Sequence, residues 1–243
     1  MICQEGALQY ALLRNTGNLD VEIAREFDFM HSNVNQTTGI IPGITIDNQY
    51  CYGQVLSSFA LGYLYFDGLN QTLADRCYND TVLVYGYVKS QWQTPATGGD
   101  PYSILLVGFD NAWKAFNYYG NTSKANEAKT IIENYARTFI NAQATSGAWG
   151  GCSAVQEHEK RNYAVILAYD ATTNATYLTA VDKNVDYLIT YHMNPTGNGG
   201  LLWTSGSNEF YECHQIWFMI DAKLLYDRSS GAYEYTDKII EAW

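Results

Sequence analysis

The chain has 243 residues, of which 47% are hydrophobic and only 16% are charged, and its formal net charge is −11. This acidic balance argues against nucleic acids and anionic membrane surfaces as partners, because no cluster of lysine and arginine is available to neutralise phosphates. No apolar run approaches the ~20 residues that span a bilayer, so we expect no membrane helix. A chain of this length can bury one extensive core, and we expect residues 1–243 to form a single domain.

Hydrophobic periodicity predicts helices along almost the whole chain, without a convincing run of alternating strand residues. Asp100 and Pro101 mark one expected helix start, since aspartate is a frequent N-cap and proline is favoured at the first helical position. Gly17, Gly68 and Gly120 mark expected helix ends. The expected helices span residues 2–13, 18–31, 47–66, 70–93, 100–119, 121–143, 153–170, 174–193, 207–227 and 233–243.

Glycine-rich loops recur along the chain and precede alternate helices. They contain Gly39, Gly98, Gly147 and Gly197, so the repeat is roughly 50 to 60 residues long, as in arrays of helical hairpins. Each loop leads into a helix that is apolar on most sides, then a tight turn and a more amphipathic helix. A helix that is apolar all round is buried on all sides, so we expect alternating inner and outer helices around one shared core. The expected inner helices span residues 47–66, 100–119, 153–170 and 207–227.

This alternation, with loops of the T-G-x-G-G and S-G-x-W-G-G type, resembles the (α/α) toroid, or six-hairpin, architecture. The resemblance covers nearly the whole chain and rests on Gly98-Gly99, on residues 147–151 and on residues 197–200. Glycoside hydrolases, polysaccharide lyases, sugar epimerases and terpene cyclases share this architecture, so it implies a fold and no single reaction. We count five hairpins, whereas a closed ring needs six. The expected all-α fold is therefore a toroid, an incomplete toroid or a piece of a longer toroidal protein.

In such toroids the loops that lead into the inner helices line the ligand cleft. The resemblance therefore implies that residues from several loops share one rim. The expected catalytic residues are Glu212, Glu209, His214, Tyr211, Asp47 and Glu157, and the expected substrate-binding residues are Trp149, Trp203, Tyr50, Tyr102 and His158. Asp100 lies at the same rim, although its N-cap position already accounts for it. No metal or other cofactor is expected, and no C-x-x-C spacing of a zinc site occurs.

Each of these candidates also has a structural explanation. Glu212 and His214 lie about one turn inside an otherwise apolar helix, where burial should perturb their pKa values, but a hydrogen-bonded structural pair fits the same position. Glu209 suits the positive end of the helix dipole without any catalytic role. The tryptophans of the glycine loops, Trp149 and Trp203, either stack on sugar rings or fill their own hairpin.

The leading functional hypothesis is an enzyme that cleaves a glycosidic bond in an oligo- or polysaccharide. Hydrolysis needs a carboxylic acid and a carboxylate on opposite sides of the bond. The rim offers Glu212 or Glu209 for one side, and Asp47, Asp100 or Glu157 for the other.

Elimination from a uronic acid polymer by a polysaccharide lyase is the first alternative, with Tyr211 and His214 as acid and base. The only cations near the rim are Lys160 and Arg161 in a chain of charge −11, and a polyanion needs positive potential, so hydrolysis is favoured. The second alternative is a non-catalytic exported protein that binds glycans or self-assembles on a surface.

Cysteines near the starts of the inner helices suggest disulfides. Consecutive inner helices of a toroid are parallel neighbours, so Cys152–Cys213 and Cys3–Cys51 are sterically possible pairs. If the protein is exported, we expect the Cys152–Cys213 disulfide, and Cys77 is then left as a free buried thiol.

The composition also favours an extracellular or cell-surface location. The chain has few lysines, many tyrosines and five N-x-[ST] sequons, at Asn35, Asn70, Asn79, Asn121 and Asn174. The N-terminus lacks the pattern of a signal peptide, so a leader, if one exists, is not part of this chain. Three of the sequons begin expected outer helices, where asparagine is a favoured N-cap whether or not it is glycosylated.

Overall fold

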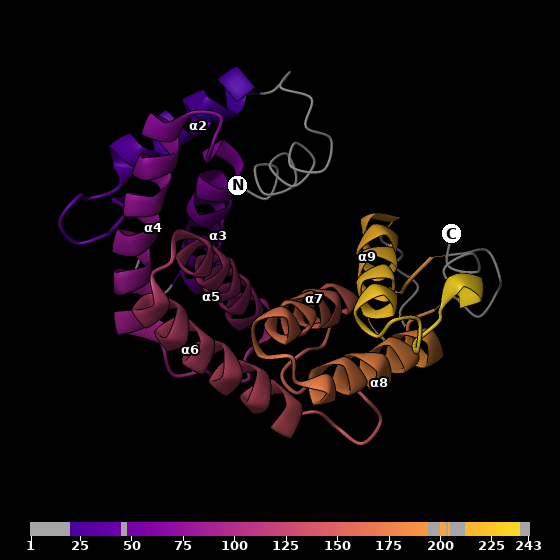
Figure 1. Cartoon of the computed structure of the whole chain (residues 1–243). Helices are drawn as coiled ribbons and strands as arrows, with labels where there is room; N and C mark the ends of the chain where they lie inside the picture. Colours follow the sequence, from indigo (N-terminus) through magenta and orange to yellow (C-terminus); the bar gives the residue numbers. More distant parts are fainter. Residues whose placement is uncertain (1–19, 45–47, 194–199, 203, 205–211, 239–243) are drawn as a thin grey trace. The chain divides into compact units, whose positions relative to one another are not determined.

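The computed structural model describes residues 20–44, 48–193, 200–202, 204 and 212–238 (Figure 1). Within these ranges the chain is helical and contains no strand, apart from an isolated antiparallel bridge between Met193 and Leu201. The predicted all-α class is therefore confirmed. No helix in the described ranges combines the length and the apolar character needed to cross a membrane. The helices are α2 (Asp20–Asn33), α3 (Gln49–Phe66), α4 (Gln71–Trp92), α5 (Gly99–Tyr119), α6 (Thr122–Asn141), α7 (Val155–Thr172), α8 (Ala175–Tyr191) and α9 (Glu212–Arg228).

Asparagine caps hold the starts of the outer helices, as predicted. Asn70, Asn121 and Asn174 each accept a hydrogen bond from a backbone N–H two or three residues later, at 3.1–3.2 Å. The prediction of an N-cap at Asp100 is wrong, because α5 already begins at Gly99. The Asp100 carboxylate lies in the first turn of the helix, where it is available for contacts with other segments.

The chain folds into two compact units. Unit 1 consists of Met1–Thr94 and Val107–Ile132, and unit 2 consists of Pro95–Leu106 and Glu133–Trp243. Helices α5 and α6 are continuous and contribute residues to both units. The single domain of residues 1–243 stays a prediction.

The core of unit 1 is built around α3, which packs mainly against α4. Every residue from Tyr52 to Tyr63 is buried, so α3 is an inner helix as predicted. Asn111 of α5 donates a hydrogen bond to the hydroxyl of Ser57 at 2.8 Å, which satisfies a buried polar group within the apolar contact. Tyr85 of α4 packs edge-on against Phe116 of α5, with the ring centroids 5.0 Å apart. Aromatic packing thus joins the outer helix to the inner ones.

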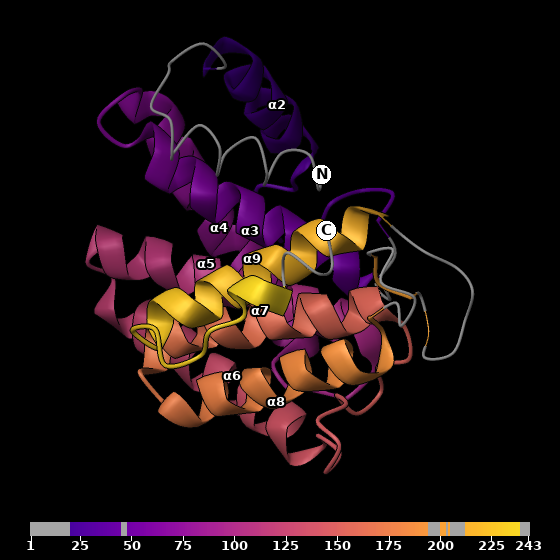
Figure 2. The ribbon, with the colours of Figure 1, turned by 90° about the vertical axis from the view of Figure 1, so that its right-hand side faces the viewer.

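Unit 2 contains α7, α8 and α9, which pack against one another (Figure 2). Helix α7 is buried on most sides, including the whole run from Ala164 to Ala168, and matches the predicted inner helix. Helix α8 buries one face through Leu178, Val181, Val185 and Leu188 and exposes the opposite face, as expected of an outer helix.

Helix α9 corrects one prediction, since it was expected to be buried on all sides. Its buried face consists of Phe218, Ala222 and Leu225 together with one polar residue, whereas Ile216 and Ile220 are exposed. Helices α7 and α8 pack against one side of α9. An apolar helix is enclosed only when neighbours cover every side, and within the described residues the outer side of α9 is uncovered.

The cysteines correct a second prediction. Cys51, Cys77 and Cys152 are free, so the predicted Cys152–Cys213 disulfide is wrong and the possible Cys3–Cys51 pair is not formed. Axes of packed helices lie about 8–10 Å apart, whereas a disulfide rarely tolerates Cα atoms more than about 7 Å apart. Neighbouring helix starts are therefore not sufficient for a bond. Cys77 is a free buried thiol as predicted, and burial raises the pKa of Cys152 to about 12.

Close backbone contact between α3 and α5 gives a test of unit 1. A Cβ atom on Gly108 would lie 2.7 Å from the carbonyl oxygen of Gly53. We expect Gly108→Ala to lower the free energy of unfolding by about 1–3 kcal/mol, because two helix backbones would have to separate. The matched control is Gly86→Ala in α4, where nothing lies within 4 Å of the added methyl group; it should stabilise the protein by about 0.5–1 kcal/mol. Urea unfolding of both variants measures the difference, and equal effects would contradict the packing described.

Candidate functional site

Two of the glycine loops meet at the starts of α5 and α7 in unit 2. The Gly99 N–H donates to the Gly151 carbonyl at 3.2 Å. Gly151 has a φ of +79°, and a Cβ atom there would lie 2.0 Å from the Thr97 carbonyl oxygen. Only glycine fits such an approach in that conformation. The glycine pattern in the sequence thus reflects direct contact between the two loop backbones.

Arg161 of α7 forms hydrogen bonds with both of these loops. Its side chain is fully buried, and its guanidinium donates to the carbonyls of Gly150 at 2.6 Å and Gly99 at 2.9 Å. The Nε atom donates to the Ser103 hydroxyl at 3.2 Å, and the guanidinium lies 4.1 Å from the ring centroid of Phe139. A buried cation is stable only when its N–H groups are paired. Arg161 therefore has a structural role at the predicted rim.

Glu157 caps the start of α7. Its Oε2 atom accepts hydrogen bonds from the backbone N–H groups of Ser153 at 2.6 Å and Ala154 at 3.1 Å, and from the Ser153 hydroxyl at 3.1 Å. A carboxylate that satisfies free N–H groups at a helix N-terminus stabilises the helix. This geometry accounts for Glu157 without catalysis, and its predicted catalytic role gains no support from it.

Trp149 and His158 are buried, so the structure lends no support to their predicted roles in substrate binding. Trp149 is 1% exposed, and its indole N–H donates to the Asn162 amide oxygen at 2.8 Å. His158 is also 1% exposed, and the Asn184 amide nitrogen lies 3.0 Å from its Nδ1 atom. The loop folds back over α7, so the tryptophan fills its own hairpin and cannot present its ring to a sugar.

The charge state of His158 follows from these contacts. The Trp149 backbone N–H lies 3.4 Å from Nδ1, so both neighbours of this atom are N–H donors and Nδ1 acts as the acceptor. Burial, the nearby His192 and Arg161 lower the pKa of His158 to about 3. The imidazole is therefore neutral at physiological pH.

Asp100 is an acidic side chain of this rim with one oxygen that forms no hydrogen bond within the described residues. Its Oδ2 atom pairs with the Lys160 ammonium at 2.5 Å. Its Oδ1 atom is buried and has no hydrogen-bond partner within the described residues, although 17% of the side chain is exposed. Tyr102, one of the predicted substrate-binding residues, follows two positions later on α5 and is half-buried beside Gly98. Asp100 and Lys160, without Tyr102, form the candidate site.

The remaining predicted site residues are not joined to this group. Tyr50 is half-buried near the start of α3 in unit 1. The positions outside the described residues are Asp47, Trp203, Glu209 and Tyr211. Glu212 and His214 belong to the first turn of α9, but their side chains lie outside the described set.

Asp221 of α9 is a buried acid that the sequence analysis missed. It is 0% exposed, and neither carboxyl oxygen has a hydrogen-bond partner within the described residues. Complete burial raises the pKa of Asp221 well above its usual range. The nearby Asn162 amide lowers this pKa in part, although it forms no well-aligned hydrogen bond with the Asp221 carboxyl. A single acid within the apolar run IWFMIDAKLL is the sequence signal that marks it.

No family model, no curated protein and no solved structure matches this chain at a significant level. Within the described residues, no group of three or more histidine, cysteine, aspartate and glutamate side chains is arranged to hold a metal ion.

The buried histidine predicts acid sensitivity. Because the folded-state pKa of His158 is lower than its ordinary value of 6.5, the unfolded chain binds the proton more readily. Stability should therefore fall as pH decreases from about 6.5 to about 3. His158→Asn, which keeps an acceptor near the Nδ1 position, should weaken this dependence. Urea unfolding at several pH values between 7 and 4 measures it, and parallel curves for parent and variant would contradict the assignment.

Buried Asp221 predicts the opposite dependence of stability on pH. A carboxyl whose pKa is raised on folding is protonated in the folded state, so its contribution to stability is lost as pH rises above about 4. Asp221→Asn removes this loss, and the variant should gain about 1.4 kcal/mol on the parent per pH unit above 4, up to the folded-state pKa. The exposed Asp237 provides the control, and Asp237→Asn is measured over the same pH range. Thermal unfolding between pH 4 and pH 8 distinguishes the outcomes.

Proposed function

We propose that the protein is a carbohydrate-active enzyme that hydrolyses a glycosidic bond in an oligo- or polysaccharide at the cell surface or outside the cell. The proposed fold is an (α/α) toroid or incomplete toroid of about five hairpins. The alternation of buried and amphipathic helices supports this fold, as do the glycine loops before α5 and α7. The assignment to carbohydrates rests on the resemblance to that architecture.

The candidate site supports a hydrolytic role through Asp100. Asp100, whose Oδ2 atom lies 2.5 Å from the Lys160 ammonium, is proposed to be the base that activates water or the nucleophile. Its second oxygen is buried and has no hydrogen-bond partner within the described residues, so it can accept a proton only from a water or substrate that enters the site. The side chain is also partly accessible at the loop rim. This unused oxygen is the observation that carries the proposal.

The partner acid is proposed to be Glu212, with Glu209 as the neighbouring alternative. Glu212 is the first residue of α9. An acid beside an apolar helix body holds its proton to higher pH, which suits the protonation of a leaving glycosidic oxygen.

The cations of the rim favour hydrolysis over elimination. A lyase that acts on uronic acids must neutralise the substrate carboxylate. Arg161 is buried and bound to loop carbonyls, and Lys160 is paired with Asp100. Neither cation is therefore available to a uronate in this geometry.

A non-catalytic role is the second candidate. The exposed Ile216 and Ile220 of α9 form an apolar strip on a described surface, and exposed apolar surface favours association. A glycan-binding or self-assembling surface protein would use such a strip, and Trp149 and His158 no longer support a sugar-binding cleft.

The proposal predicts a loss of turnover on neutralisation of either acid. Asp100→Asn and Glu212→Gln should each lower cleavage of a neutral polysaccharide at least about 100-fold, as expected for acid–base groups. A panel of neutral and uronic polysaccharides is screened, with reducing ends reporting hydrolysis and ultraviolet absorbance reporting unsaturated uronates.

Two controls separate catalysis from folding. Asp28→Asn removes a surface ion pair with Arg76 in unit 1 and should leave turnover unchanged. Glu157→Gln weakens the cap of α7, so it should lower the melting temperature with little loss of turnover per folded molecule. Full activity of Asp100→Asn would make Asp100 structural. A parent that cleaves nothing in the panel would favour the non-catalytic alternative.

A further inference from the structure

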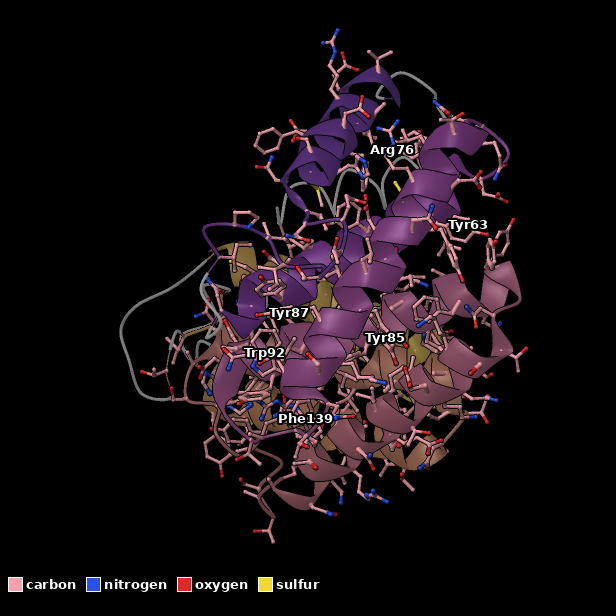
Figure 3. The ribbon with its side chains drawn as sticks, turned by 90° about the vertical axis from the view of Figure 1, so that its left-hand side faces the viewer. Tyr63, Arg76, Tyr85, Tyr87, Trp92 and Phe139 are labelled. Atoms are coloured by element: carbon pink, nitrogen blue, oxygen red, sulfur yellow. The ribbon has the colours of Figure 1, made fainter. Side chains whose placement is uncertain are left out.

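Four tyrosines gather in unit 1 at the turn that joins α3 to α4 and at the end of α5. Tyr63 belongs to α3, Tyr78 to α4, and Tyr118 and Tyr119 to the last turn of α5. In Figure 3, Tyr63 lies towards the Arg76 end of the α3–α4 hairpin, away from the Trp92 end. The cluster is therefore remote from the end of the hairpin at which α3 begins and α4 ends.

Two of these rings are buried and two are exposed. Tyr63 and Tyr78 are 4% and 6% exposed, whereas Tyr118 and Tyr119 are 62% and 56% exposed. Two adjacent, largely exposed tyrosines at one helix end form an amphipathic surface, with an apolar ring body and a polar hydroxyl on each.

The buried rings fix the orientation of the exposed ones. Tyr119 stacks on Tyr78 with centroids 3.8 Å apart and planes 15° from parallel. Tyr118 and Tyr119 each meet Tyr63 edge-on, at 5.9 and 6.0 Å. Because Tyr78 covers one face of Tyr119, the exposed part of this ring includes the opposite face.

Hydrogen bonds hold the same arrangement at its edges. The Tyr118 hydroxyl donates to the Asp67 carboxylate at 3.0 Å, and the Asn121 amide donates to the Tyr78 hydroxyl at 3.1 Å. Asp67 is half-buried at the end of α3, and its carboxylate can accept further hydrogen bonds. Rings fixed before binding lose little conformational entropy when a ligand docks.

We propose that Tyr118, Tyr119 and Asp67 form a glycan-binding site on unit 1, separate from Asp100. One face of a pyranose ring carries several C–H groups and packs flat on an aromatic ring, while its hydroxyl groups lie at the edge. The open face of Tyr119 matches the apolar face of the sugar, and the Asp67 carboxylate accepts a hydrogen bond from a hydroxyl. The choice of a sugar as ligand rests on the proposed function. The arrangement of Tyr118, Tyr119 and Asp67 is observed independently of it.

Affinity electrophoresis in gels that contain soluble neutral polysaccharides tests this site. The full chain carrying Asp100→Asn is used, so that cleavage does not alter the gel. We expect at least one polysaccharide to retard the protein, and the further substitutions Tyr118→Ala and Tyr119→Ala together to weaken binding at least tenfold. Tyr119→Phe keeps the stacked ring and should retain the retardation. Phe29→Ala removes an exposed ring elsewhere in unit 1 and should also retain it.

Melting temperatures of all variants show whether each remains folded, and the single substitutions Tyr118→Ala and Tyr119→Ala are measured if the double variant unfolds. The proposal is overturned if the tyrosine variants bind as tightly as the Asp100→Asn protein that carries them, or if no neutral polysaccharide retards that Asp100→Asn protein. It is also overturned if sedimentation shows that the tyrosines change only self-association.

The measurements separate this site from the proposed hydrolase activity. If the unsubstituted protein releases reducing ends and the tyrosine variants bind polysaccharide as before, the site at Tyr118 and Tyr119 is overturned and the hydrolase proposal stands. If retardation depends on the tyrosines and the unsubstituted protein cleaves no polysaccharide, the site at Tyr118 and Tyr119 is supported and the hydrolase proposal is overturned.

Discussion

The buried guanidinium of Arg161 is the interaction on which the geometry of unit 2 depends. Removing a cation from water costs several kcal/mol, and the cost is offset only when its N–H groups find acceptors. Here the acceptors are the carbonyls of Gly99 and Gly150 and the hydroxyl of Ser103. Two glycine loops are therefore held by one side chain of α7. The ring of Phe139 lies against the guanidinium and excludes water from it.

This arrangement places the neighbouring polar groups of α7. Lys160 precedes the buried arginine and reaches Asp100, whereas Asn162 follows it and receives the indole N–H of Trp149. Successive residues of a helix point about 100° apart, so one helix can serve the accessible rim and the buried core together. Asp221 lies on the buried side, where the low dielectric favours its neutral form. Asp100 at the rim thus has a cation as partner, whereas Asp221 is enclosed by the core.

The helices and their order could be predicted from the sequence, because periodicity, N-caps and terminal glycines are local properties. The asparagine caps show this most directly, since their bonds reach only two or three residues along the chain. The burial of α3 also followed from its composition. The sequence failed at α9, where Ile216 and Ile220 are exposed, because the cover of a helix depends on neighbours that its own residues do not specify. The disulfides failed for the same reason, since helix order does not define the distance between Cα atoms.

The candidate site depended far more on tertiary structure. The sequence alone determined that glycine loops precede α5 and α7 and that acidic and aromatic residues lie near them. The tertiary structure decided their roles. Trp149 and His158 lie in the core, and Glu157 caps a helix. Asp100 pairs with Lys160, which lies 60 positions later in the sequence. The physical reason is that burial and ion pairing arise between segments that are far apart in the chain, and residue type determines only which contacts are possible.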